Sequence, residues 1–199
     1  MNKRQNTRLI AFSGIFIALL LGVGYALAFV PNVELLTAMV FLSGVLMGFK
    51  RGIFIGVVGE FLFSALNPMG SGLLFPPMLA AQLVAMAVVS SIGALMRNFV
   101  LTSTHRLLNS IIIGGIGLLL TLFYDILVSA AFPVSAGFSL REIVGTIIAG
   151  LAFSIVHLIG NTLVFILLVP VAARQIYRAV PFFSEFMPVK SSNEKPNAL

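Results

Sequence analysis

The chain has 199 residues, of which 59% are hydrophobic and 9% are charged, and its net charge is +6. A mean hydropathy of +1.11 excludes an ordinary soluble domain, in which about 25% of residues are charged. The basic residues stand singly or in pairs between apolar runs, which indicates membrane topology rather than a nucleic-acid surface. The sequence therefore predicts an integral membrane protein.

The first apolar segment has two features that bear on its role. Basic residues followed by an apolar stretch and Ala26-Leu27-Ala28 imitate a signal peptide, but the apolar run exceeds the usual length of about 7–15 residues, so we expect the segment to be retained. Small residues also recur every four positions, at Gly14, Ala18 and Gly22, and such a ladder lets another helix approach closely. The partner of this ladder is either the bundle itself or a separate membrane subunit.

Five further apolar segments follow along the chain. A helix needs about 20 residues to cross the hydrocarbon core, and fewer where the bilayer thins. We predict an all-α integral membrane protein, a bundle of six transmembrane helices over residues 9–30, 35–49, 53–66, 78–96, 108–131 and 143–171. The second and third segments are short, and Lys50-Arg51 between them indicates a tight turn. Residues 1–175 form the membrane domain in this prediction, and 176–199 form a cytoplasmic tail that is disordered at its end.

The orientation follows from the basic residues. On a six-helix zigzag only Arg141 falls on one side. The other side receives Lys3, Arg4, Arg8, Lys50, Arg51, Arg97, Arg106, Arg174, Arg178, Lys190 and Lys195. By the positive-inside rule, both termini are predicted to be cytoplasmic.

Two carboxylates lie deep inside apolar segments, Glu60 and Asp125. An ionisable group within a membrane costs about 3 kcal/mol on insertion scales, so it marks a candidate site. Further polar residues lie in or beside the apolar runs: Glu34, Asn67, Gln82, His157 and Asn161. At helical spacing these residues form polar faces on four segments, mostly in the predicted outer half of the membrane. This distribution favours a binding cavity that opens to the outside.

Structural roles remain open for each of these residues. Glu60 can be a protonated acid bonded to a neighbouring helix, and Asp125 can do the same or pair with Arg141. Glu34 stands at a helix start, where a carboxylate complements the helix dipole. The amides of Asn67, Gln82 and Asn161, like the His157 ring, can be hydrogen-bonding groups between helices.

Sequence motifs for catalysis are missing. The chain contains no G-x-x-x-x-G-K-[ST], no H-E-x-x-H, no G-x-S-x-G and no cysteine. With only two histidines, a site of several histidines for a metal is not expected. We therefore predict no enzymatic activity, no catalytic residues, no metal and no cofactor.

The pattern resembles the substrate-binding S component of energy-coupling factor (ECF) transporters, a branch of the ABC transporters. The resemblance covers about residues 7–175 and rests on six spans with both termini inside, on PNVELLTAMVFLSGVLMG and on GVVGEFLFSALNPMG. It implies a subunit in a prokaryotic plasma membrane that binds a vitamin or related micronutrient. It also implies a membrane T component and two ABC-type ATPases as partners.

The resemblance extends to individual positions. It implies a pocket lined by Asn67, Gln82, Tyr124, Asp125 and His157, with Asn32 and Glu34 in the gating loop 31–34. Members of this family often carry A-x-x-x-A on the first helix for docking on the T component, and Gly14-x-x-x-Ala18 is the nearest match here. An acid-rich pocket suits a ligand with amine, amide or cationic groups, cobalamin-like compounds included.

Two other functions compete with this interpretation. A proton-coupled secondary transporter would use Glu60, Asp125 and His157 as a relay, although a relay should also continue into the inner half. A membrane-embedded enzyme or a scaffold of similar shape is the third reading, in which Glu60 and His157 act as base and acid.

Overall fold

A computed structural model describes residues 3–30, 33–186 and 188–189, and within them it contains helices and no strand. The predicted all-α class is therefore confirmed. The elements are α1 (Lys3–Leu27), α2 (Leu36–Ala65), the 3-10 turn η1 (Gly72–Leu74), α3 (Pro76–Thr102), α4 (Arg106–Ser135), α5 (Leu140–Phe153), α6 (Ile155–Leu167), α7 (Val169–Ala179) and α8 (Pro181–Phe186).

Several helices are long and apolar enough to cross a membrane. Among the described residues these are α1, α2, α3 and α4, with α5 and α6 as a fifth if the bent pair forms one span. Large apolar side chains are exposed on these helices, and α5 buries none of its residues. Outward-facing apolar helices are what a lipid environment requires. The architecture is that of a multi-pass membrane protein.

The element α2 reverses direction inside its bounds. Gly48 has φ 77° and ψ −178°, a backbone conformation that is not helical. A Cβ atom added at Gly56 would lie 2.8 Å from Cγ1 of Val40, whereas residues 16 apart in one straight helix are separated by about 24 Å. Residues 36–47 and 49–65 therefore form two antiparallel halves. The tight turn expected at Lys50-Arg51 is present, and it begins at Gly48.

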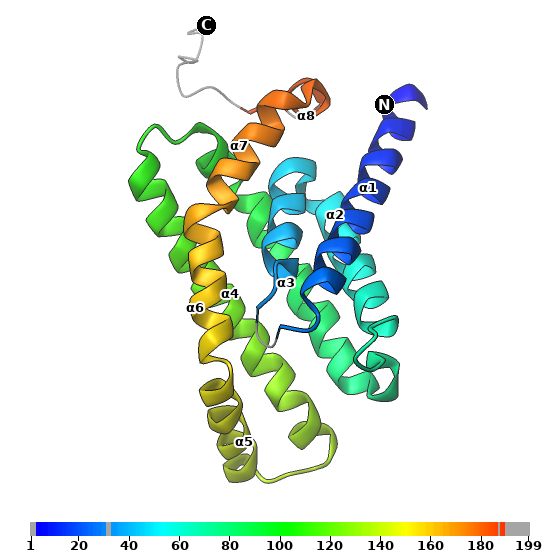
Figure 1. Ribbon diagram of the computed structural model, residues 1–199, viewed down its shortest axis with the longest axis vertical. Helices are drawn as coiled ribbons and strands as arrows, with labels where there is room; N and C mark the ends of the chain where they lie inside the picture. The colour runs from blue at the N-terminus through cyan, green and yellow to red at the C-terminus, as the bar shows by residue number, and fades with distance from the viewer. Residues whose placement is uncertain (1–2, 31–32, 187, 190–199) are drawn as a thin grey trace, which may run out of the picture.

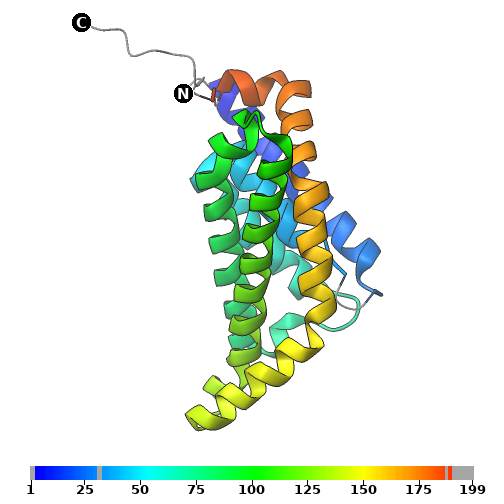
Figure 2. The ribbon, with the colours of Figure 1, turned by 90° about the vertical axis from the view of Figure 1, so that its left-hand side faces the viewer.

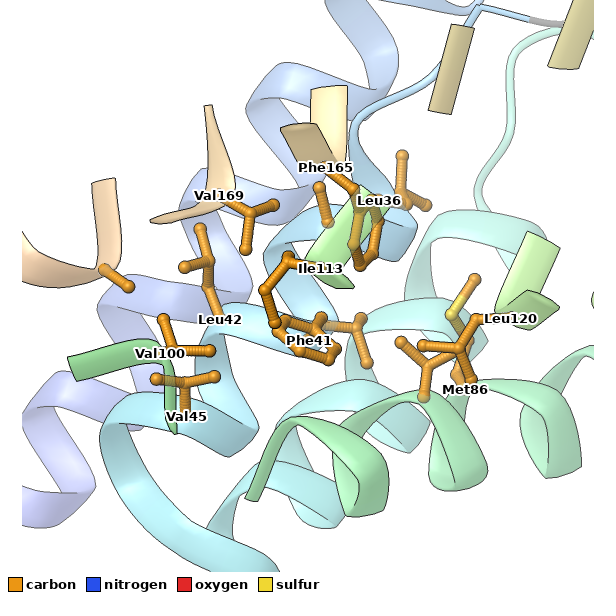
Figure 3. Packing of buried hydrophobic residues seen from close by; sticks show 14 of the residues in the cluster. Leu36, Phe41, Leu42, Val45, Met86, Val100, Ile113, Leu120, Phe165 and Val169 are labelled. Atoms are coloured by element: carbon orange, nitrogen blue, oxygen red, sulfur yellow. The ribbon is translucent and has the colours of Figure 1, made fainter. Parts of the chain in front are cut away.

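The first half of α2 runs through the centre of the molecule. Nearly every residue of 36–48 is buried, and the segment is apolar on all sides, as a fully enclosed helix requires. Figure 3 shows Phe41 of this helix close to Ile113 of α4 and Phe165 of α6. Two glycines let α3 approach this central helix closely. A side chain at Gly44 would clash with the Ser90 carbonyl, and one at Gly93 would clash with the Phe41 carbonyl.

The segment predicted as one span over 143–171 is divided into three helices. α5 and α6 meet at Ser154 with a bend of 58°, and Figure 2 shows α5 turned away from the line of α6. α6 ends at Leu167, and Pro170 stands in the first turn of α7, where its missing N–H leaves no unpaired donor. Helix also continues through α7 and α8 where a tail was predicted, and residues 190–199 lie outside the described part.

The helix ends gather at two opposite ends of the molecule. Figure 1 shows the start of α1, the α3–α4 connection, α7 and α8 at one end, while the α2–α3 and α4–α5 connections lie toward the other. Side-chain hydrogen bonds connect neighbouring helices at the first of these ends. Arg51 donates to Asn6 over 3.4 Å, and Arg174 donates to Asn109 and to the Val100 carbonyl over 2.8 Å each.

The small-residue ladder of α1 faces outward. Gly14, Ala18 and Gly22 are exposed, and a Cβ added at either glycine would meet nothing within 4 Å. The opposite face, which includes Phe16 and Leu20, packs on the bundle. The ladder therefore does not serve packing within this chain among the described residues.

Candidate ligand-binding site

A cavity of about 420 Å³ lies among the ends of α1 and α2, the second half of α4 and the break between α5 and α6. The volume falls in the lower part of the range for small-molecule sites, about 300–1,000 Å³. Apolar side chains such as Phe63, Met86 and Phe153 form much of the wall. The polar part of the lining consists of Glu34, Thr37, Glu60, Asn67, Tyr124, Asp125, Ser129, Ser154 and His157.

A hydrogen-bonded triad forms one side of the wall. His157 of α6 lies between two carboxylates, with Nδ1 2.9 Å from Oδ1 of Asp125 and Nε2 3.2 Å from Oε1 of Glu34. His157 and Asp125 are 7% and 6% exposed. Because carboxylates only accept, a hydrogen bond to each of them needs a proton on the ring nitrogen that faces it. Nδ2 of Asn161 also lies 2.9 Å from Nε2, and it donates to Oε1 of Glu34. The triad connects α4, α6 and the segment that precedes α2.

Glu34 has two separate tasks. Its Oε2 accepts from the backbone N–H of Thr37 at 2.9 Å, in the first turn of α2, where amides lack partners within the helix. Its Oε1 accepts from Nδ2 of Asn161 at 2.8 Å and faces His157. The helix-start role and the role in the cavity wall therefore belong to the same carboxylate, one oxygen to each.

Acceptor atoms in the wall are left without partners. Glu60 is 2% exposed and lines the cavity, yet none of the described residues forms a hydrogen bond or ion pair with its carboxylate. Oδ2 of Asp125 and Oγ1 of Thr37 are buried in this wall and have no hydrogen-bond partner within the described residues, and Oδ1 of Asn161, which does not line the cavity, also lacks one. Buried polar atoms are nearly always paired in native proteins. Unpaired atoms around a cavity therefore indicate groups that a bound molecule completes.

The Tyr124 hydroxyl is positioned by a chain of two side-chain hydrogen bonds. Nε2 of Gln82 donates to the Tyr124 hydroxyl over 3.2 Å, and the hydroxyl of Ser64 donates to Oε1 of Gln82 over 3.0 Å. The Tyr124 ring stands edge-on to the His157 ring, with 6.0 Å between their centroids. This chain of bonds orients one aromatic wall of the cavity.

The structure brings six of the nine predicted binding residues together at the cavity: Glu34, Glu60, Asn67, Tyr124, Asp125 and His157. Gln82 and Asn161 do not line it and instead bond to Tyr124 and to Glu34. Asn32 lies outside the described residues. The partner of Asp125 is His157 and not Arg141, which is exposed. Their role in binding stays a prediction.

Some lining residues were not predicted. Ser129 lies one turn beyond Asp125, and Ser154 lies one turn before His157, so the polar faces of these helices contained the signal for both. Thr37, which is 1% exposed, stands three residues after Glu34 at the start of an apolar run. Its sequence context is that of an ordinary helix start, and only the fold brings it to the cavity.

The charges of the wall are mostly negative. Three acidic side chains and one histidine line the cavity, and neither lysine nor arginine is among the lining residues. Nowhere in the described part of the chain are three His, Asp or Glu side chains grouped in a way that could hold a metal ion. In comparisons with family models, with curated proteins and with solved structures, nothing matches this chain.

Proposed function

We propose that this chain is the substrate-binding subunit of an ECF-type uptake transporter, taking up a vitamin or related micronutrient in a prokaryotic plasma membrane. The observation that carries the proposal is the cavity of about 420 Å³ with unpaired buried acceptors in its wall. A wall of this kind is suited to hold a small molecule. Catalysis has less support, because the chain contains no hydrolase or ATPase motif.

The topology in this proposal has six spans and both termini in the cytoplasm. The spans are α1, the two halves of α2, α3, α4 and the bent pair of α5 with α6. Support comes from the reversal at Gly48 and from the basic residues near the start of α1, near that reversal and in α7. By the positive-inside rule this end faces the cytoplasm. The cavity, which lies toward the opposite ends of these helices, would then open outward.

Partner subunits supply the energy in this proposal. They are a membrane T component and two ABC-type ATPases. The exposed ladder of Gly14, Ala18 and Gly22 supports such a partner, because small residues allow close helix contact and no described residue of this chain covers them.

The test is purification of the tagged chain from its own membranes in mild detergent, followed by native mass spectrometry. We expect a bound small molecule and association with ATPase subunits. The variant Ala18→Leu should lose the partners and keep the bound molecule. The control Gly115→Leu should keep both, because Gly115 of α4 has open space around it, as Gly14 and Gly22 of the ladder do. Absence of ATPase subunits together with absence of a bound molecule would refute the proposal.

A proton-coupled transporter is the second candidate, because the triad of Asp125, His157 and Glu34 is a short hydrogen-bonded relay. The relay ends at Asn161, which bonds back to Glu34 and whose Oδ1 has no partner among the described residues. Uptake into proteoliposomes without ATP that a protonophore abolishes would favour this candidate.

A further inference from the structure

The unpaired atoms in the cavity wall share one chemical character. Glu60 and Asp125 line the cavity, and the Glu60 carboxylate and Oδ2 of Asp125 are acceptors there, because the oxygens of an ionised carboxylate only accept hydrogen bonds. A molecule that completes this wall therefore presents donors. Thr37 is compatible with either partner, because its hydroxyl both donates and accepts.

The wall also lacks a free positive charge. His157 is the one basic side chain among the lining residues, and both of its ring nitrogens already face carboxylates. An anionic molecule would find no arginine or lysine there and would meet Glu60 and Asp125 instead. A buried carboxylate without a partner is unfavourable, and a cation placed beside it relieves that.

The apolar part of the wall indicates the chemistry of the rest of the bound ligand. Phe63, Tyr124 and Phe153 line the cavity together with Met86. Aromatic faces attract organic cations and pack on flat apolar bodies. No group of three His, Asp or Glu that could hold a metal ion is found in the described ranges, so the wall is better suited to an organic molecule than to a bare metal ion.

We propose that the substrate is a small organic cation, an apolar or aromatic body that carries a protonated amine, whose charged end binds between Glu60 and Asp125. The inference rests on the proposed function in that it takes this cavity as the substrate site. It narrows the micronutrient to one charge class. The cavity of about 420 Å³ also favours a compact molecule over a large macrocycle of the cobalamin type.

The test uses matched probes on the full chain, purified in detergent. Tryptamine, tryptophol and indole-3-acetate carry the same ring with an ammonium, a hydroxyl and a carboxylate. Benzylamine, benzyl alcohol and benzoate repeat the comparison with a smaller body. Isothermal titration calorimetry should give an affinity at least tenfold higher for the amine of at least one set, and no binding of the carboxylates.

Variants locate the effect. Glu60→Gln and Asp125→Asn should each reduce the preference for the amine by tenfold or more, whereas Glu185→Gln, at an exposed residue of α8, should leave it unchanged. A thermal unfolding scan of each variant verifies folding. If Asp125→Asn does not fold, the Glu60→Gln result decides alone.

Three outcomes overturn the inference: tighter binding of an alcohol or carboxylate, equal binding of all members, or no binding of any probe. The outcome is separate from that of the proposed function. A chain that prefers amines but never associates with ATPases keeps the substrate class and loses the transporter role. A chain that associates with ATPases and prefers neutral molecules does the reverse.

Discussion

At the residue scale, His157 is the residue on which the cavity wall depends. It lies 2.9 Å from Asp125 and 3.2 Å from Glu34. It therefore separates two carboxylates whose negative charges would otherwise lack a nearby positive group. Removing one member of a buried ion pair is more harmful than replacing the whole pair, because the remaining charge has no partner.

We predict that His157→Gln lowers stability by about 3 kcal/mol, since it leaves Asp125 and Glu34 without a counter-charge. Thermal unfolding of the purified protein measures the change. His105→Gln serves as the control, because His105 is exposed. Adding Asp125→Asn to His157→Gln should restore part of the loss, and strictly additive losses would contradict the pairing.

At the element scale, the reversal of α2 at Gly48 packs its two halves closely, and a Cβ atom added at Gly52 would lie 2.7 Å from the Cα atom of Gly44. Gly48 has a positive φ of 77° together with an extended ψ, a combination that is essentially confined to glycine and costs other residues about 1–3 kcal/mol. The reversal places the two halves of α2 side by side and brings Glu60 and Glu34, 26 positions apart in the sequence, to one cavity.

We predict that Gly48→Ala destabilises the protein by about 1–3 kcal/mol, because alanine disfavours that backbone conformation. The midpoint of thermal unfolding gives the comparison. Gly115→Ala is the matched control, since Gly115 lies in a helix with open space around it and alanine is the better helix former. Equal effects at both glycines would count against the reversal.

A second element-scale contact supports this turn. Arg97 of α3 donates from its guanidinium to the carbonyls of Val45 and Leu46, the latter at 2.9 Å, and lies over the Tyr177 ring at 5.4 Å. The two carbonyls stand at the end of the first half of α2, where they lack partners within the helix. A planar guanidinium meets both carbonyls and the ring simultaneously.

We predict that Arg97→Lys lowers stability by about 2 kcal/mol, because an ammonium cannot reproduce the fork of donors and the ring contact. Thermal unfolding of the variant and the parent protein in the same mild detergent measures this loss of stability. Arg106→Lys, at an exposed position, should change nothing. If the stability of Arg97→Lys is unchanged, a positive charge at position 97 is sufficient and the planar guanidinium is not required.

At the scale of the whole molecule, the proposed orientation follows from a difference between its two ends: basic residues gather at one end, and the cavity lies toward the other. The natural absence of cysteine makes the orientation easy to test. We predict that Ser135→Cys, near the α4–α5 connection, reacts with a membrane-impermeant maleimide on intact cells. Thr104→Cys, in the α3–α4 connection, should react only after permeabilisation. The reverse pattern would invert the proposed topology and place the cavity on the cytoplasmic side.

Much of the helical layout was predictable because it depends on local composition. Helices α3 and α4 contain the predicted spans 78–96 and 108–131 and extend two to six residues beyond them at each end, since apolar runs between polar residues define the spans. The break at Ser154 was not predicted, because the run over 143–171 has no proline before Pro170, near its end. Both α5 and α6 contact α4 on either side of the bend, and such contacts between helices are not visible in the composition of the run.

The polar residues illustrate the same division. Their presence in apolar runs and their helical spacing pointed to a shared cavity, and six of the nine predicted residues line one. Gln82 and Asn161 could not be distinguished from lining residues by spacing, because a polar side chain on an inward face can either reach the cavity or support a neighbour. Which of the two it does depends on the rotation of each helix about its axis.

By itself, the sequence determined that this is an all-helical protein with several membrane-length segments, since composition and hydrophobic runs decide that locally. It also determined which polar residues are costly enough to need a role. Only the tertiary structure decided that Asp125 pairs with His157, 32 residues away, that Glu34 closes the triad, and that Glu60 stays unpaired. Hydrogen bonds act over about 3 Å, so their partners are set by how helices pack and not by their order in the chain.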